Sequence, residues 1–145
     1  MRDLSLAEYR ALAELRFQIR EFVHFSEEQA RAGRLEPQQH QLLLAIKGLP
    51  EGKRATIGEL AGRLHLKHHS TVELVDRLMA HGAVVRAPSR EDRREVIVHL
   101  TRAGAGLLRR LTLAHRHELE DTAPRLARAL RTVMRHGHKE KVQAA

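Results

Sequence analysis

The stretch that decides the fold runs over residues 64–78, LHLKHHSTVELVDRL, and continues at residues 81–86 with HGAVVR. Inward-facing side chains recur in it at a three- and four-residue spacing, which predicts a helix over residues 68–81. Gly82 follows at a position where many helices end in a left-handed residue. The face that we expect to be buried consists of Thr71, Leu74, Val75 and Leu78.

A shorter helix is expected before this one. Thr56 is followed three residues later by Glu59. This is the pattern of a capping box, in which the hydroxyl caps the helix start and the carboxylate reaches back to the cap residue. The break at residues 65–67 separates the helix so begun from the helix over residues 68–81. Two short helices joined by a tight turn are typical of a helix-turn-helix.

The hydrophobic period changes from helical to alternating after Gly82. Residues 84–86 and 96–100 alternate as short strands do, and the polar segment PSREDRR at residues 88–94 separates them. We therefore expect a β-hairpin directly after the two short helices, which makes a winged helix-turn-helix. In such a fold the second helix enters the major groove of DNA, where its outward side chains read base edges, and the hairpin reaches the backbone or the minor groove.

Long helices are expected on both sides of this region. Residues 4–32 carry an apolar stripe at helical spacing, and Pro37 suits the first turn of a second helix. After the hairpin, the sequence predicts one long helix as far as Asp121. Thr122 and Pro124 are then expected to start another helix.

The expected fold class is mainly α with a small β-hairpin wing (α+β), a winged helix-turn-helix with long N- and C-terminal helices. The first and last helices each carry an apolar stripe that a small winged domain could not cover, so we expect two chains to associate through them. The expected DNA-binding region is residues 37–101. Residues 1–36 and 102–145 would form the helical dimerisation region, intertwined with it in one domain.

Four pieces of this sequence resemble the MarR family of transcription regulators. They are residues 64–78, residues 81–86, the triplet Asp92-Arg93-Arg94, and the segment LTRAG at residues 100–104. Each piece alone is weak, but their order and spacing are specific, and the flanking helices extend the resemblance over nearly the whole chain. The resemblance implies a homodimer that binds a pseudo-palindromic operator on double-stranded DNA as a ligand-responsive regulator, a repressor or an activator, of which we expect a repressor. The family places its small-molecule ligands between the dimer region and the winged domains.

The candidate DNA contacts lie on the second short helix and on the turn of the hairpin. They are His68, His69, Ser70, Val72, Glu73 and Arg77 on the helix, and Arg90, Arg93 and Arg94 on the turn. Glu73 departs from the family pattern, because a carboxylate repels phosphate, although it can accept a hydrogen bond from a cytosine amino group. Arg77 has two open interpretations, a phosphate contact or an ion pair with an acidic neighbour. Asp92 is expected to orient Arg94.

Other basic side chains also have two open interpretations. Lys53 and Arg54 either contact phosphate or only increase solubility. An arginine stripe on the last helix is either a solvated face or a partner for acidic residues of the first helix across a dimer interface, where an exposed ion pair contributes about 0–1 kcal/mol. The stripe is Arg125, Arg128, Arg131 and Arg135, and the acids are Glu14, Glu21, Glu27 and Glu28.

Composition narrows the range of functions. The formal net charge is +8, which favours anionic partners and above all nucleic acid. No apolar run approaches the ~20 residues of a membrane-spanning helix, and residues 1–9 lack the apolar core of a signal peptide. We therefore expect a cytoplasmic protein without a membrane partner. The absence of Cys excludes disulfides, thiolate metal sites and thiol-based sensing.

We expect no enzymatic activity and no cofactor, because the sequence has no Gly-rich phosphate loop, no Gly-x-Ser-x-Gly and no His-Glu-x-x-His motif. Two alternatives to a sequence-specific regulator stay open. One is a nonspecific architectural DNA-binding protein. The other is a metal-dependent regulator in which His40 combines with His115 or His117. A carboxylate or His24 would complete the set of metal ligands. Against this alternative, His115 and His117 are two positions apart and diverge around a helix.

Overall fold

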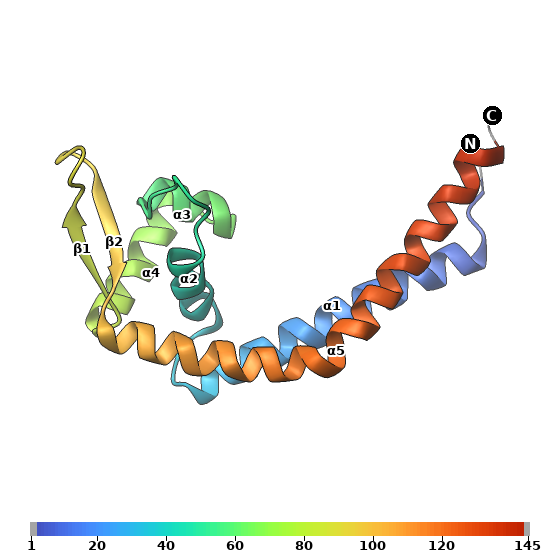
Figure 1. Ribbon diagram of the computed structural model, residues 1–145, viewed down its shortest axis with the longest axis horizontal. Coiled ribbons are helices and arrows are strands. Elements are labelled where there is room, and N and C mark those ends of the chain that lie inside the picture. Colours follow the sequence, from blue (N-terminus) through green and yellow to red (C-terminus); the bar gives the residue numbers. More distant parts are fainter. Residues whose placement is uncertain (1–2, 144–145) are drawn as a thin grey trace. The chain divides into compact units, whose positions relative to one another are not determined.

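The computed structural model describes the backbone of residues 3–143 and the side chains of residues 3–136. The elements are α1 (Leu6–Ala32), α2 (Pro37–Lys47), α3 (Ile57–Leu64), α4 (His68–Ala80), β1 (Val84–Pro88), β2 (Val96–Leu100) and α5 (Arg102–Gln143) (Figure 1). The expected mainly α architecture with a hairpin wing is confirmed. The chain forms two compact units. The winged unit is Gln29–Thr112, and the helical unit comprises the described parts of Met1–Glu28 and Leu113–Ala145.

The start of α3 follows the expected cap only in part. The backbone N–H of Glu59 donates to Thr56 Oγ1 at 3.1 Å, so the hydroxyl caps the helix as expected. The expected return contact from the Glu59 carboxylate is wrong. That carboxylate lies 3.3 Å from Nε of Arg63, one turn further along, and the Thr56 N–H donates to the Arg54 carbonyl. A charged partner at i,i+4 competes with the cap for the same oxygen atoms.

The turn between α3 and α4 is tight because His65 adopts a left-handed backbone, with φ 52°. At the other end of α4, Gly82 has φ 70°, which confirms the expected left-handed residue after the helix. The predicted inward face is also confirmed. Its members Thr71, Leu74, Val75 and Leu78 are all buried.

The hairpin shares one hydrophobic core with α4. β1 and β2 are antiparallel, with Val84 opposite Leu100. The Val98 N–H donates to the Ala55 carbonyl at 2.9 Å, so β2 also binds the segment before α3. The largest fully buried aliphatic side chains of this core are Leu42, Leu43, Leu60, Val75, Leu78, Val84 and Val98. Common packing therefore ties the base of the wing to the second helix of the helix-turn-helix.

The start of α5 packs closely on the turn between α4 and β1. A Cβ atom on Gly104 would lie 2.0 Å from the carbonyl oxygen of Ala83, so no larger residue fits without a backbone shift. Thr101 caps the helix, because its Oγ1 accepts a hydrogen bond from the Gly104 N–H at 3.0 Å and donates to the Gly82 carbonyl at 2.6 Å. These contacts join the winged fold to its C-terminal helix.

α5 is a single helix, so the expected restart at Thr122 and Pro124 is wrong. Pro124 has no N–H and cannot make one intrahelical hydrogen bond. Thr122 is nevertheless buried, and its hydroxyl donates to the Glu118 carbonyl at 3.0 Å instead of capping a new helix. The Leu, Ala and Arg residues that follow Pro124 are strong helix formers, and they carry the helix onward.

In the helical unit, α1 and α5 meet around a polar pair. Nε2 of His115, which is buried, lies 2.8 Å from Oγ of Ser26. The rings of Phe22 and Phe25 make T-shaped contacts with the imidazole, with centroids 6.2 Å and 5.5 Å away. Neither these helices nor any other in the described part of the chain combines the length and apolar character that crossing a bilayer requires.

Candidate DNA interface

α4 begins with a polar, uncapped turn. His68, its first residue, and His69 are exposed, and Ser70 is half-buried. The preceding residue, Lys67, makes no side-chain cap, and no acidic residue lies in this turn. Backbone N–H groups at such a helix end favour an anion. In a helix-turn-helix this end of the second helix is the one that meets base edges.

Further along α4, two outward side chains form ion pairs. Nη1 of Arg77 lies 3.3 Å from Oε2 of Glu36, and the two side chains are 58% and 64% exposed. Asp76 Oδ1 lies 2.6 Å from Nη1 of Arg86 on β1. The acid that binds Arg77 is thus the residue that caps the start of α2, and it does not come from α4 itself. Because an exposed pair of this kind contributes only about 0–1 kcal/mol, Arg77 can exchange Glu36 for a phosphate.

The middle of the outward face is less basic. Val72 is half-buried and Glu73 is exposed. Within residues 3–136, Glu73 forms no ion pair, so no neighbouring cation cancels its charge. A carboxylate in this position opposes nonspecific attraction to phosphate, and it is able to accept a hydrogen bond from a base amino group.

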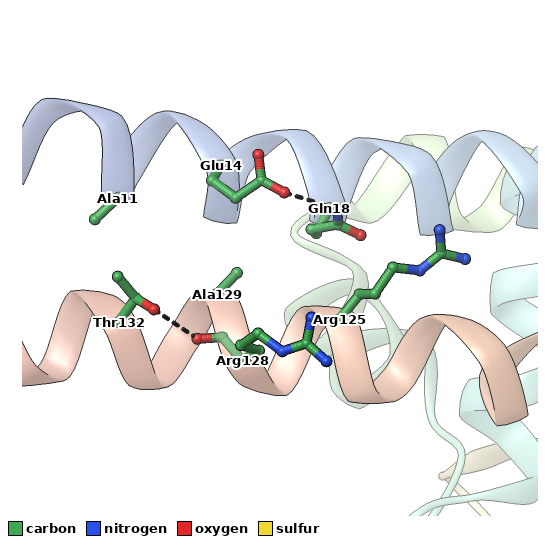
Figure 2. A pocket seen from close by; sticks show the side chains of 7 residues that line it. All are labelled: Ala11, Glu14, Gln18, Arg125, Arg128, Ala129 and Thr132. Atoms are coloured by element: carbon green, nitrogen blue, oxygen red, sulfur yellow. Dashed lines mark hydrogen bonds between the residues drawn. The ribbon is translucent and has the colours of Figure 1, made fainter. Parts of the chain in front are cut away.

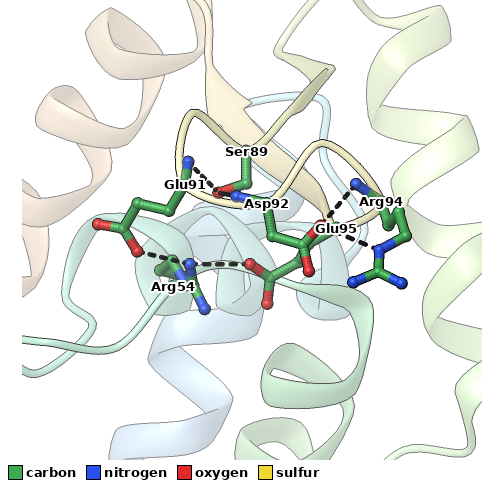
Figure 3. Close-up of polar contacts among 6 residues, drawn as sticks. All are labelled: Arg54, Ser89, Glu91, Asp92, Arg94 and Glu95. Carbon is green, nitrogen blue, oxygen red and sulfur yellow. Dashed lines mark hydrogen bonds and ion pairs between the residues drawn. The ribbon is translucent and has the colours of Figure 1, made fainter.

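Two short side chains organise the turn of the hairpin (Figure 3). Ser89 is buried, and its Oγ accepts hydrogen bonds from the N–H groups of Glu91 at 3.2 Å and Asp92 at 3.4 Å. Asp92 Oδ1 accepts one from the Arg94 N–H at 3.0 Å and lies 3.4 Å from Nε of the same residue. As expected, Asp92 orients Arg94.

The arginines of this turn are accessible. Arg90 and Arg93 are exposed, and the Arg94 side chain is 93% exposed. In the part of the chain that the structure describes, neither Arg90 nor Arg93 forms an ion pair. Three guanidinium groups on one short turn can bind phosphates or enter a narrow minor groove.

A contact that the sequence did not predict joins the segment before α3 to the hairpin. Nη1 of Arg54 lies 2.8 Å from Oε2 of Glu91 and 3.0 Å from Oε2 of Glu95 (Figure 3). The two interpretations left open for Arg54, a phosphate contact or solubility alone, did not include this ion pair. No local pattern could have indicated it, because Arg54 and Glu91 are 37 residues apart.

The described residues contain no group of three His, Asp or Glu side chains that could hold a metal ion. Two His residues considered for the metal-dependent alternative have carboxylate partners on their own helices. Nε2 of His24 lies 3.3 Å from Oε1 of Glu28, and Nδ1 of His117 lies 3.6 Å from Oε2 of Glu120. This part of the chain therefore provides no geometry that favours a metal-dependent regulator.

Comparison of the sequence with known proteins matches the chain to a family profile and to a related protein. The sequence profile of the MarR family matches residues 35–95. The chain is also 33% identical over 66 residues to YsmB, an uncharacterized HTH-type transcriptional regulator of Bacillus subtilis. That match covers 46% of this chain and 45% of YsmB, which is less than half of either protein.

Solved structures share the fold over most of the chain. AbsC, a MarR family transcriptional regulator from Streptomyces coelicolor, has a TM-score of 0.70 at 20% identity, and the similarity covers 96% of this chain and 99% of AbsC. BpsR of Bordetella bronchiseptica, whose DNA binding is regulated by 6-hydroxynicotinic acid, has a TM-score of 0.61 at 18% identity, with 86% and 89% covered. At these identities the likeness shows the fold alone, a winged helix-turn-helix with long flanking helices.

Proposed function

Because the sequence profile of the MarR family matches residues 35–95, we propose that the protein is a sequence-specific DNA-binding transcription regulator of this family, acting as a homodimer on a pseudo-palindromic operator. One observation carries the proposal. The winged unit presents both the polar outward face of α4 and a hairpin turn with three exposed arginines. Because α4 and the hairpin share one core, a helix inserted in the major groove brings the wing to the same DNA.

The first turn of α4 is the proposed base-reading element. His69 and Ser70 can hydrogen-bond to base edges, and each good contact of this kind is worth about 1–3 kcal/mol of discrimination. Glu73 would accept from a cytosine amino group. His68, at the helix N-terminus, and Arg77 would contact phosphates.

The wing is the proposed source of sequence-independent affinity. Its three arginines would bind phosphates or a narrow minor groove next to the major-groove site. Such contacts position the protein on the duplex, while base contacts select the site. The arginines in question are Arg90, Arg93 and Arg94.

The helical unit is the reason for proposing a homodimer. Large apolar side chains recur on the outer side of α1 and remain exposed, and α5 adds others. They are Tyr9, Leu12, Ile19 and Val23 on α1, and Leu113, Leu130 and Met134 on α5. Apolar surface of this extent marks an interaction site more often than a free surface. A second copy would cover it and bring two winged units to the two halves of an operator.

Charged side chains of the helical unit also support a second copy of this chain as its partner. Arg125 and Arg128 line a cavity of about 200 Å³ together with Glu14 and Gln18 (Figure 2). Glu14 Oε1 accepts a hydrogen bond from Gln18 Nε2 at 2.9 Å, and neither arginine forms an ion pair among the described residues. In the proposed dimer, acidic residues on the first helix of the second copy pair with these two guanidinium groups.

The proposal includes regulation by a small molecule. BpsR, with which this chain shares its fold, has its DNA binding regulated by 6-hydroxynicotinic acid. By analogy, this protein would repress by occupying its operator and would release it when a ligand binds. Because a DNA-binding regulator acts where the DNA is, we propose that the protein is cytoplasmic.

Binding of labelled promoter DNA from the protein's own locus, in the presence of excess random DNA, tests the proposal. A sequence-specific regulator prefers its site over random DNA by about 10³-fold or more. A nonspecific architectural protein would release the label in proportion to the competitor, and an absence of binding would reject both functions. Sedimentation of the same complex should give two chains per operator.

A further inference from the structure

The Arg54 guanidinium bridges two parts of the winged unit that are distant in sequence (Figure 3). Its Nη1 lies 2.8 Å from Oε2 of Glu91 and 3.0 Å from Oε2 of Glu95. Arg54 belongs to the segment between α2 and α3, whereas both carboxylates follow β1 on the hairpin turn. The contact therefore connects the body of the unit with the wing.

The two carboxylates contribute unequally to this bridge. Glu91 is 80% exposed, and an ion pair there is weak. Glu95 is 27% exposed, and its Oε2 is buried without a well-oriented hydrogen bond in the described structure, so Arg54 supplies its counter-charge. Removal of the cation would leave this inaccessible oxygen atom without a partner, which is unfavourable. Without Arg54, the wing would have to shift until water reached Oε2 of Glu95.

Hydrogen bonds connect Glu95 with the rest of the hairpin turn. The Ser89 N–H donates to the Glu95 carbonyl at 2.7 Å. Oγ of Ser89 in turn accepts hydrogen bonds from the N–H groups of Glu91 and Asp92. Since these bonds run from one side of the turn to the other, a shift of Glu95 would carry the neighbouring arginines with it.

We propose that Arg54 is a positioning residue for DNA binding. Its ion pair with Glu95, called the latch below, holds the wing in place and directs the three arginines of the turn toward the DNA. Arg54 acts without touching a phosphate itself. It also offsets part of the negative charge that Glu91 and Glu95 present beside those arginines. This inference rests on the proposed function, because it concerns the same DNA interface.

The first test measures the position of the wing without DNA. The chain has no Cys, so Gly62→Cys and Arg90→Cys allow two spin labels, one on α3 and one on the turn. A Cβ on Gly62 meets nothing within 4 Å, so this label fits. The distribution of label distances should broaden with Arg54→Ala and stay close to the original with Arg54→Lys. Identical distributions for all three would overturn the latch, even if the protein binds no DNA.

The second test separates the latch from a phosphate contact. Arg54→Ala should weaken promoter binding about tenfold. In a protein that already carries Glu91→Gln and Glu95→Gln, Arg54→Ala should change the affinity for promoter DNA less than about twofold, because the carboxylates through which Arg54 acts are gone. Equal losses in both backgrounds, with a salt slope lower by about 0.9, would mean a direct phosphate contact. Lys53→Ala is the matched control. Its effect should be equal in the two backgrounds, because the carboxylate near Lys53 is that of Glu59, 3.9 Å away, and not one of the hairpin turn.

A charge exchange gives an independent readout. Arg54→Glu should weaken promoter binding, and adding Glu95→Arg should recover most of the loss, because the ion pair forms again with its charges reversed. A direct phosphate contact predicts no recovery, since position 54 stays acidic. Melting temperatures show whether each variant folds. If Arg54→Ala alone fails to fold, promoter binding by the Arg54→Glu/Glu95→Arg variant tests the proposal in its place. If the original protein binds no promoter DNA, the proposed function fails. The distances between the two spin labels then still test whether Arg54 holds the wing in place.

Discussion

At the turn between α3 and α4, His65 holds a left-handed backbone that strains a residue with a Cβ atom. We expect His65→Gly to raise the free energy of unfolding by about 0.5–1 kcal/mol, because glycine adopts this conformation without a steric cost but loses more chain entropy. Urea denaturation measures the change. His81→Gly is the matched control, since His81 ends α4 with a right-handed helical backbone. That variant should lose stability, and equal shifts at both positions would contradict the explanation.

The first turn of α4 allows a second prediction for single residues. His69→Ala and Ser70→Ala should each lose ~1–3 kcal/mol of discrimination at particular base pairs, because a base-edge hydrogen bond is removed. Binding to random DNA should change much less, since phosphate contacts supply most of it. Affinities for promoter and random DNA, with melting temperatures, distinguish this role from simple packing. A uniform loss on both DNAs would place the base-reading face elsewhere.

Among the elements, the docking of α5 depends on a glycine. Gly104→Ala should lower the free energy of unfolding by about 1–3 kcal/mol, because the new Cβ would lie 2.0 Å from the Ala83 carbonyl oxygen. Gly106→Ala, two residues further along the same helix, is the control. Its Cβ would meet only the end of the Arg110 side chain at 3.9 Å, so better helix propensity should add about 0.5–1 kcal/mol. Chemical denaturation of both variants tests the contrast.

The wing is the other element with a measurable role. Arg93→Ala combined with Arg94→Ala should weaken binding to every DNA sequence and flatten its salt dependence. The slope should be smaller by about 0.9 for each phosphate that the variant no longer neutralises. If the wing enters a minor groove, operators with A·T-rich flanks should lose most affinity. Titrations at several salt concentrations measure both effects. An unchanged slope in the double variant would remove the wing from the interface.

For the whole molecule, association of two copies is the quantity to measure. Ile19 and Val23 are 42% and 40% exposed on α1, so their replacement by Glu should cost the isolated chain little and the dimer much. Sedimentation should show weaker association. Operator binding should weaken with it, because two linked winged units are needed to engage two half-sites.

The control for this experiment is Arg20→Glu, which puts the same side chain one position further along without removing apolar surface. That variant should remain associated. If the Ile19→Glu/Val23→Glu chain sediments like the original protein, the outer side of α1 is not the contact between copies. The proposed operator geometry would then need another interface.

The sequence by itself determined the elements whose cause is local. The burial of one face of α4 follows from side-chain spacing, and the end of that helix follows from Gly82, which has the positive φ that glycine adopts freely. The hairpin follows from alternation on both sides of a polar turn. Periodicity and backbone preference act over a few residues, so they can be read without knowing the fold.

Only the tertiary structure decided how distant residues meet. Arg77 pairs with Glu36, 41 residues away, and the Val98 N–H donates to the Ala55 carbonyl. The bridge from Arg54 to the hairpin turn joins residues that no local pattern relates. Each outcome depends on which groups the folded chain brings within a few ångströms of one another. Coulomb attraction and burial act over these distances, and the order of residues along the chain does not reveal them.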